Sequence, residues 1–147
     1  MSRSVRLFLV VLLGVAGLSA MAEEAPFAPV PASEVVLADL LYQKRIVAIF
    51  ADDPLDPNFL RQMALVAINS ADLVERDVIV VFDADPAAAT ALRTKLRPRG
   101  FALVILDKDG KVALRKPLPW DTREISRAID KFPIRREEML QRRPAGR

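Results

Sequence analysis

A short apolar strand that runs straight into a helix is the feature that most constrains the fold. Ile46–Phe50 is a near-continuous apolar run, as is typical of a strand buried on both faces of a sheet. Asp56 and Pro57 follow as a helix N-cap and a first-turn proline, and apolar residues then recur at helical spacing from Phe59 to Ile68. The sequence therefore predicts a core strand that leads directly into a core helix.

The same pattern recurs along the chain. Asp85 and Pro86 start a second helix after a second strand, and an Asp-Gly turn joins the last two strands. The further strands are expected at Val78–Phe82, Phe101–Leu106 and Lys111–Arg115. Asp121 or Thr122 starts a last helix, which ends at Phe132-Pro133, and Ser33 caps a short helix before the first strand.

This order, β-α-β-α-β-β-α, indicates an α/β fold. A right-handed crossover makes the first two strands parallel, and the hairpin adds two antiparallel strands. We therefore expect a mixed four-stranded sheet with helices on both faces.

The order from Arg45 to Phe132 resembles the thioredoxin fold. Pro54-Leu55-Asp56-Pro57 lies where such proteins have Cys-x-x-Cys, and Phe101 lies where they have a cis-proline. Both signature elements are absent, so the resemblance implies a thioredoxin-like architecture without thiol–disulfide activity.

Several pieces of the chain also resemble DUF4174, a bacterial family of exported, thioredoxin-like domains of unknown function. The most specific piece is Asp130–Met139, in which family members tend to have methionine where this chain has Phe132 and Ile134. The other matching pieces are Leu40–Phe50, Glu75–Val78 and Phe101–Arg115. The resemblance implies a fold and a compartment, and no reaction.

The composition excludes several functions. Apolar residues make up 52% of the chain, which is ample for a packed core. There is no cysteine, which rules out a disulfide, a thiolate nucleophile or a zinc–thiolate site, and no histidine, which removes the usual general base near neutral pH. We expect no cofactor. We also expect no nucleic-acid partner, because the formal net charge is only +3.

The first residues have the three-part pattern of a secretory signal. A basic start to Arg6 precedes an apolar stretch, Leu7–Leu18, and small residues favour cleavage after Ala22. A membrane anchor is the alternative, but the stretch is shorter than a spanning helix needs. We expect export, to the periplasm if the source has two membranes, with no span left after cleavage. Loss of Arg3 and Arg6 lowers the net charge from +3 to +1.

The chain therefore divides into four predicted regions. Residues 1–22 are a signal peptide, 23–33 an extended linker with three prolines, 34–134 the thioredoxin-like domain, and 135–147 a charged tail. The tail has room for one more helical turn, through Met139.

Four acids follow the first two strands and are candidate metal ligands: Asp52, Asp53, Asp83 and Asp85. Parallel strands would gather these carboxylates at one edge of the sheet, where oxygen ligands suit a divalent cation. Helix capping is the simpler interpretation and needs no metal. We expect no metal, and keep as the alternative function a divalent-metal-dependent enzyme acting on a phosphate or sugar.

The leading hypothesis is a non-redox module of the cell envelope that binds an unknown protein or small ligand. Charged residues in the loops, the hairpin and the tail form a possible interaction surface, with catalytic residues unknown: Arg76, Lys108, Arg115, Arg135, Arg136 and Glu138. The alternative for these residues is a solvated edge whose charges prevent aggregation.

Overall fold

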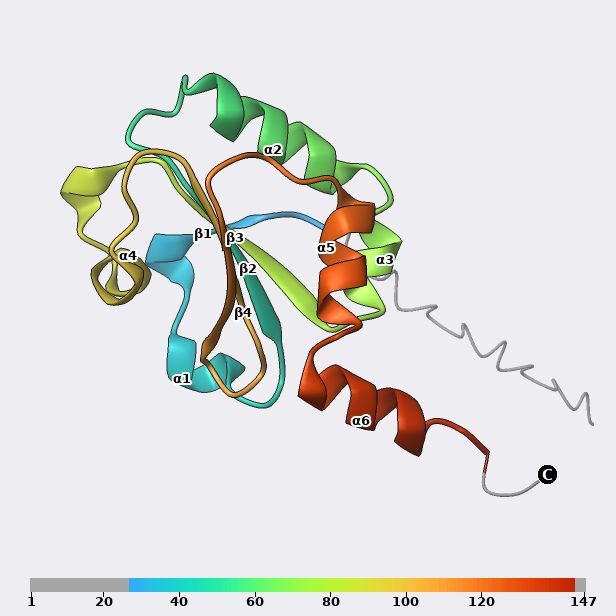
Figure 1. The fold of residues 1–147 in the computed structure, drawn as a ribbon. Coiled ribbons are helices and arrows are strands. Elements are labelled where there is room, and N and C mark those ends of the chain that lie inside the picture. Colours follow the sequence, from blue (N-terminus) through green and yellow to red (C-terminus); the bar gives the residue numbers. More distant parts are fainter. Residues whose placement is uncertain (1–26, 145–147) are drawn as a thin grey trace, which may run out of the picture.

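A mixed sheet between two layers of helices makes up the part of the chain that the computed structural model describes, residues 27–144 (Figure 1). The sheet has five strands in the order β1-β3-β2-β4-β5. Their bounds are Val30–Pro31 for β1, Arg45–Phe50 for β2, Val78–Asp83 for β3, Ala102–Leu106 for β4 and Val112–Lys116 for β5. The predicted signal segment lies outside the described residues.

The strand directions confirm the predicted fold. β2 lies parallel to β3, with Arg45 opposite Val78 and Phe50 opposite Asp83. β4 is antiparallel to β2, and β5 is antiparallel to β4. A β-α-β unit followed by a β-hairpin, with the two units meeting in one sheet, is a thioredoxin-like α/β fold.

One strand was not predicted. Val30 and Pro31 pair in parallel with Val81 and Phe82, so β1 adds a fifth strand at the edge of the sheet. The sequence could not show this strand, because two residues have no detectable period. Proline is tolerated there because an edge strand does not need every N–H group.

The alternation of side chains in the strands explains the two helical layers. In β2, Val47 and Ile49 face one core while Ile46, Ala48 and Phe50 face the other. The first core lies under α2 (Pro57–Ala67), α3 (Ser70–Val74) and α5 (Thr122–Ile129). The second lies under the 3-10 helix η1 (Ala32–Glu34), α1 (Leu37–Leu40) and α4 (Ala91–Leu96).

Three helices differ from the sequence expectations, and one of them, α3, was not predicted. The predicted helix after β3 is split into the 3-10 helix η2 (Pro86–Ala88) and α4, because Ala89 has a left-handed backbone with φ of 45°. Thr90, rather than Asp85, caps α4, and Asp85 caps η2. Ser33 lies inside η1 and caps no helix.

Most of the predicted charged tail is helical, as α6 (Pro133–Gln141), where the sequence indicated room for only one turn. α5 ends at Ile129, with Asp130 as its C-cap, a little before the predicted stop at Phe132-Pro133. Pro133 opens α6, where a proline suits the first turn. The helix runs past Met139, and Arg135 on its inner side is buried. No helix among the described residues is long and apolar enough to cross a membrane.

Candidate functional site

The turn between β2 and α2 is ordered by its own acids. An Asp53 oxygen accepts the Leu55 N–H at 2.7 Å, and an Asp56 oxygen accepts the N–H groups of Asn58 and Phe59 at 2.8 and 3.2 Å. Asp56 is therefore the N-cap of α2, which confirms the sequence prediction. Pro54 is exposed, so the turn that we predicted to occupy the place of Cys-x-x-Cys is a fixed surface turn without a sulfur atom.

A hollow of about 570 Å³ lies beside this turn. It is lined by residues from the carboxyl ends of β2 and β3, which we call the acidic hollow: Asp52, Asp53, Pro54, Phe82, Ala84 and Asp85. Phe82 supplies an aromatic wall and packs on Phe59 with ring centroids 6.4 Å apart. Three of the four predicted metal-ligand candidates thus come together at the sheet edge, as parallel strands require.

The fourth candidate, Asp83, does not line the hollow. Its side chain is buried, and its two oxygens bind the Arg93 guanidinium at 2.9 Å and the Thr90 hydroxyl at 2.7 Å. The same Arg93 nitrogen donates to the carbonyl of Ala51 at 2.8 Å. Asp83 and Arg93 therefore tie α4 to the ends of β2 and β3.

Burial acts to raise the pKa of Asp83, but hydrogen bonds from Arg93, Thr90 and the Asp85 N–H outweigh it and hold the pKa below the ordinary value of 3.8. Asp83 is thus ionised at neutral pH and is already balanced by a guanidinium. Asp85 accepts the Ala87 N–H at 3.0 Å, which is a capping contact. Within residues 27–144 no group of three or more acids is placed to hold a metal ion.

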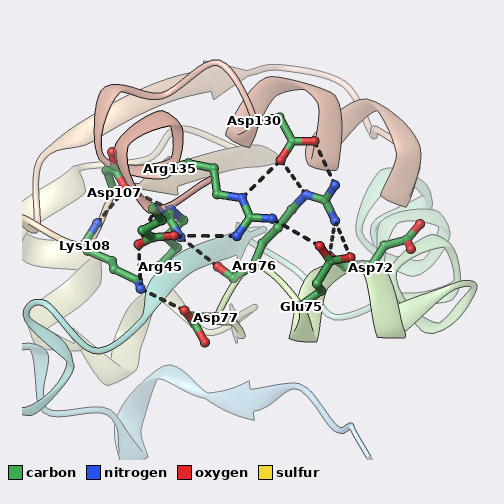
Figure 2. Close-up of polar contacts among 10 residues, drawn as sticks. Arg45, Asp72, Glu75, Arg76, Asp77, Asp107, Lys108, Asp130 and Arg135 are labelled. Atoms are coloured by element: carbon green, nitrogen blue, oxygen red, sulfur yellow. Dashed lines mark hydrogen bonds and ion pairs between the residues drawn. The ribbon is translucent and has the colours of Figure 1, made fainter. Parts of the chain in front are cut away.

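A second polar cluster lies at the opposite end of β2 and β3 (Figure 2). Arg45, the first residue of β2, has 0% of its side chain exposed. Its guanidinium donates to Asp107 at 3.0 Å, to the Arg76 carbonyl at 2.9 Å and to both oxygens of Glu138 at 3.1 and 3.2 Å. One buried cation thus joins β2, the loop before β3, the hairpin and α6.

Lys108 supports the same carboxylate. Its ammonium lies 2.7 Å from Glu138 and 2.8 Å from Asp77. Burial acts to lower the pKa of Lys108, yet hydrogen bonds to Asp77 and Glu138 raise it above the ordinary value of 10.5. Burial likewise acts to raise the pKa of Glu138, but Lys108 and Arg45 hold it below 4.5. Both groups are therefore charged at neutral pH.

Two more arginines fasten α5, α6 and the end of α3. Arg76 binds both oxygens of Asp130, at 2.9 and 2.8 Å. Arg135 lies 3.3 Å from Asp130 and 3.2 Å from Glu75. Burial acts to raise the pKa of Asp130, but Arg76 and Arg135 hold it below its ordinary value of 3.8.

Most of the predicted interaction surface is thus engaged within the chain. Arg76, Lys108, Arg135 and Glu138 make the ion pairs just described, and only 2% of Arg135 is exposed. Arg115 is exposed, although its guanidinium donates to the Leu96 carbonyl at 2.7 Å. Arg136 is exposed on α6, and partner binding by these residues stays a prediction.

Sequence reasoning did not single out the two central arginines, Arg45 and Arg93. Arg45 could have been noticed, because a charged residue directly before a fully apolar strand needs a partner if it enters the core. For Arg93 there was no comparable signal, since it looks like an ordinary basic residue of a short helix.

The architecture defines the class, a thioredoxin-like domain without the redox residues. A family profile described as "Domain of unknown function (DUF4174)" matches residues 36–138. The chain therefore belongs to the DUF4174 family. The match ends at Glu138, inside α6, so the family pattern includes the residue that Arg45 and Lys108 hold.

Comparison with solved structures and curated proteins adds little. The chain is similar to chloroplastic thioredoxin z, with 18% identity, a TM-score of 0.47, and coverage of 70% of this chain and 92% of the other. No curated protein matches the sequence.

Proposed function

We propose that the chain is a non-redox binding module of the cell envelope and that its ligand occupies the acidic hollow. The observation that carries this proposal is the hollow itself, which lies beside the turn that replaces Cys-x-x-Cys. The turn keeps a fixed shape through Asp53 and Asp56 but has no sulfur atom for chemistry. A shaped and unreactive concavity suits recognition rather than catalysis.

The side chains around the hollow indicate the kind of ligand. Phe82 and Ala84 provide an apolar wall, and the acids Asp52, Asp53 and Asp85 also line the hollow. Leu55, at the tip of the turn, is 75% exposed and adds apolar contact area. We therefore expect a ligand with an apolar body and a positive charge, such as a basic peptide segment, because opposite charges favour both association and orientation.

Binding can be tested with two matched short peptides, one with arginines between leucines and one with glutamates in their place. Amide chemical shifts in an isotope-labelled protein should move at Asp53–Leu55 and Phe82–Asp85 only with the arginine peptide. Leu55→Ser and Asp53→Asn should each weaken binding about fivefold or more. Asp39→Asn, an exposed acid on α1, is the matched control and should leave the affinity unchanged.

Shifts that are equal for both peptides, or that persist in the Leu55→Ser and Asp53→Asn variants, would refute this assignment of the ligand site. Absence of any shift at millimolar peptide would do the same.

Calorimetric titration with Mg²⁺, Mn²⁺ and Ca²⁺ separates the proposal from the alternative of a metal-dependent enzyme. We expect no saturable heat, because Asp83 is held by Arg93 and Asp85 caps η2. Saturable binding at millimolar or lower concentration, abolished by Asp52→Asn, would favour the metal enzyme instead.

The envelope location is a separate part of the proposal, supported by the signal-like pattern of residues 1–22. Cell fractionation should recover the protein outside the cytoplasm, and N-terminal sequencing should begin at Glu23. Recovery from the cytoplasm with Met1 still present would contradict export.

A further inference from the structure

The edge of β3 is only half covered. β1 pairs with Val81 and Phe82 and with no earlier residue of β3. In the same register Pro29 would lie opposite Val80, but the pairing with β3 begins only at Val30. The edge at Val78–Val80 therefore has no neighbouring strand among residues 27–144.

Hollows flank this free edge on both faces of the sheet. A hollow of about 700 Å³ on one face is lined by Phe27, by Ala71 and Val74 of α3, and by Val78 and Val80. A smaller one of about 180 Å³, on the other face, is lined by Ile79, by the apolar residues Val35, Val36 and Leu40, and by the acids Glu34 and Asp39. We call the strand edge with these two hollows the edge groove.

This geometry fits an added strand. The side chains of an extended peptide alternate between the two faces of a sheet, so each hollow would receive every second side chain. Main-chain hydrogen bonds to Val78–Val80 would supply affinity without requiring a particular sequence. The larger hollow is mainly apolar, whereas the smaller one also carries the acids Glu34 and Asp39, so only the side chains that enter the larger hollow must be apolar.

The opposite edge of the sheet, at β5, is charged and irregularly paired. Beside β5 the chain carries Lys111, Arg115 and Lys116, and the pairing of β5 with β4 is irregular near Ile105 and Leu106. Charges and irregular pairing both discourage strand addition. The edge at Val78–Val80 carries no charged side chain, so the two edges are not equivalent.

The charges around the larger hollow select the direction of the peptide. Lys44 and Glu75 both line it, but Glu75 is paired with Arg135 at 3.2 Å and Arg76 at 3.6 Å. Lys44 has no ion-pair partner in the described part of the chain. Since Lys44 directly precedes Arg45, which pairs with Val78, it lies at the end where β3 begins.

We propose that the edge groove binds an extended segment of a partner protein as an added antiparallel strand, with apolar side chains toward the larger hollow and an acidic C-terminal end that contacts Lys44. An antiparallel strand ends where β3 begins, so its terminal carboxylate or an acidic side chain meets the unpaired ammonium. A parallel strand would bring its amino end there instead. This surface is separate from the acidic hollow, which has the opposite charge.

The full chain can be tested with two labelled peptides that alternate valine and threonine. One ends in glutamate with a free carboxylate, and the other ends in an amidated lysine. The acidic peptide should bind about fivefold tighter, the size expected for one partly exposed ion pair. Lys44→Glu should reverse that preference, whereas Lys111→Glu, an exposed lysine of the hairpin, should not change it.

Hydrogen exchange in the unaltered protein gives an independent readout. The acidic peptide should slow exchange at Val78 and Val80, whose N–H groups face away from β2, and leave β5 unaffected. Val74→Glu in the groove wall should abolish that protection. Leu55→Ser and Asp53→Asn should not weaken it, so the two proposed sites fail or succeed separately.

Four outcomes would overturn the proposal. In the first, neither peptide binds; in the second, both peptides bind equally well; in the third, the amides that the peptide protects lie in β5. In the fourth, the amides of Val78 and Val80 are already protected without peptide, either by dimerisation that depends on protein concentration or by residues 1–26, whose removal would then expose them. A second copy or the chain's own N-terminal segment would in that case be the occupant.

Discussion

Arg45 shows how a single side chain can connect distant parts of the chain. Its guanidinium has partners 31, 62 and 93 residues away, and none of its side chain is exposed. A planar guanidinium suits this position, because its N–H groups form a fixed fork that can bind a carboxylate with two bonds. Lysine would keep the charge and lose that fork.

We predict that Arg45→Met lowers the free energy of unfolding by about 3–5 kcal/mol, because it leaves Asp107 and Glu138 without their buried partner. Arg45→Lys should cost less than Arg45→Met. Urea denaturation followed by circular dichroism measures both effects. Arg136→Met, an exposed arginine on the same helix as Glu138, should stay within about 0.5 kcal/mol of the unaltered protein.

The acids of the β2–α2 turn should contribute unequally to the stability of the fold. Asp56→Ala should destabilise by about 1 kcal/mol, since it removes the acceptor of two helix N–H groups. Asp52→Ala should have a smaller effect, because that exposed carboxylate makes only a 3.6 Å contact with Arg93. If thermal unfolding showed equal losses, helix capping would not be the role of Asp56.

At the scale of elements, α6 depends on charges for its position. It has few inward apolar residues, and Arg135 and Glu138 on its inner side make ion pairs to α3, α5, β2 and the hairpin. Such a helix should detach more readily than α2, which is anchored by Phe59 and Val66 in the core.

Acid should loosen α6 first. The pKa values of Glu138 and Asp130 are lowered in the folded protein, so their stabilising effect is complete above the ordinary values of 4.5 and 3.8. It is lost as the pH falls through the lowered folded values, when both carboxyls become protonated. Hydrogen exchange should therefore accelerate in α6 below about pH 4 while α2 stays protected.

The variant Glu138→Gln tests whether protonation of Glu138 causes the loosening of α6 in acid. This variant should be less stable at neutral pH and should lose less further stability in acid. Its neighbour Glu137 is exposed, so Glu137→Gln should keep the original pH dependence. An unchanged acid response in Glu138→Gln would show that another group controls α6.

The whole molecule is one sheet with a core on each face, and few elements can leave it independently. The side-chain amide of Gln62 in α2 accepts the backbone N–H of Trp120 at 2.9 Å and donates to the backbone carbonyl of Trp120 at 2.8 Å. These two bonds join the first helical layer to the segment after β5. Trp120 itself packs against the core beneath α2 and α5.

We therefore predict a single cooperative transition near neutral pH. Fluorescence of Trp120, the chain's one tryptophan, and far-ultraviolet circular dichroism should give the same urea midpoint. A fluorescence midpoint well below that of circular dichroism would mean that the hairpin and α5 unfold separately from the β2–α2–β3 unit.

Much of this architecture was predictable because its signals are local. Apolar runs marked β2, β3 and β4, and each acid-proline pair marked a helix start within a few residues, at Asp56 and at Asp85. The absence of cysteine and histidine excludes thiol and imidazole chemistry by composition alone. Local signals could not reveal β1, since two residues carry no period, or the break at Ala89, since its left-handed backbone has no sequence mark.

The sequence by itself determined the order of elements, the two apolar faces of each inner strand and the lack of redox chemistry, because these depend on neighbouring residues. Only the tertiary structure decided that Asp83 faces Arg93 while Asp85 faces the hollow, that Glu138 meets Arg45, and that Val78–Val80 remains uncovered. Those outcomes depend on which side chains, far apart in the chain, share one burial site, and the energy of a buried charge is set by that partner.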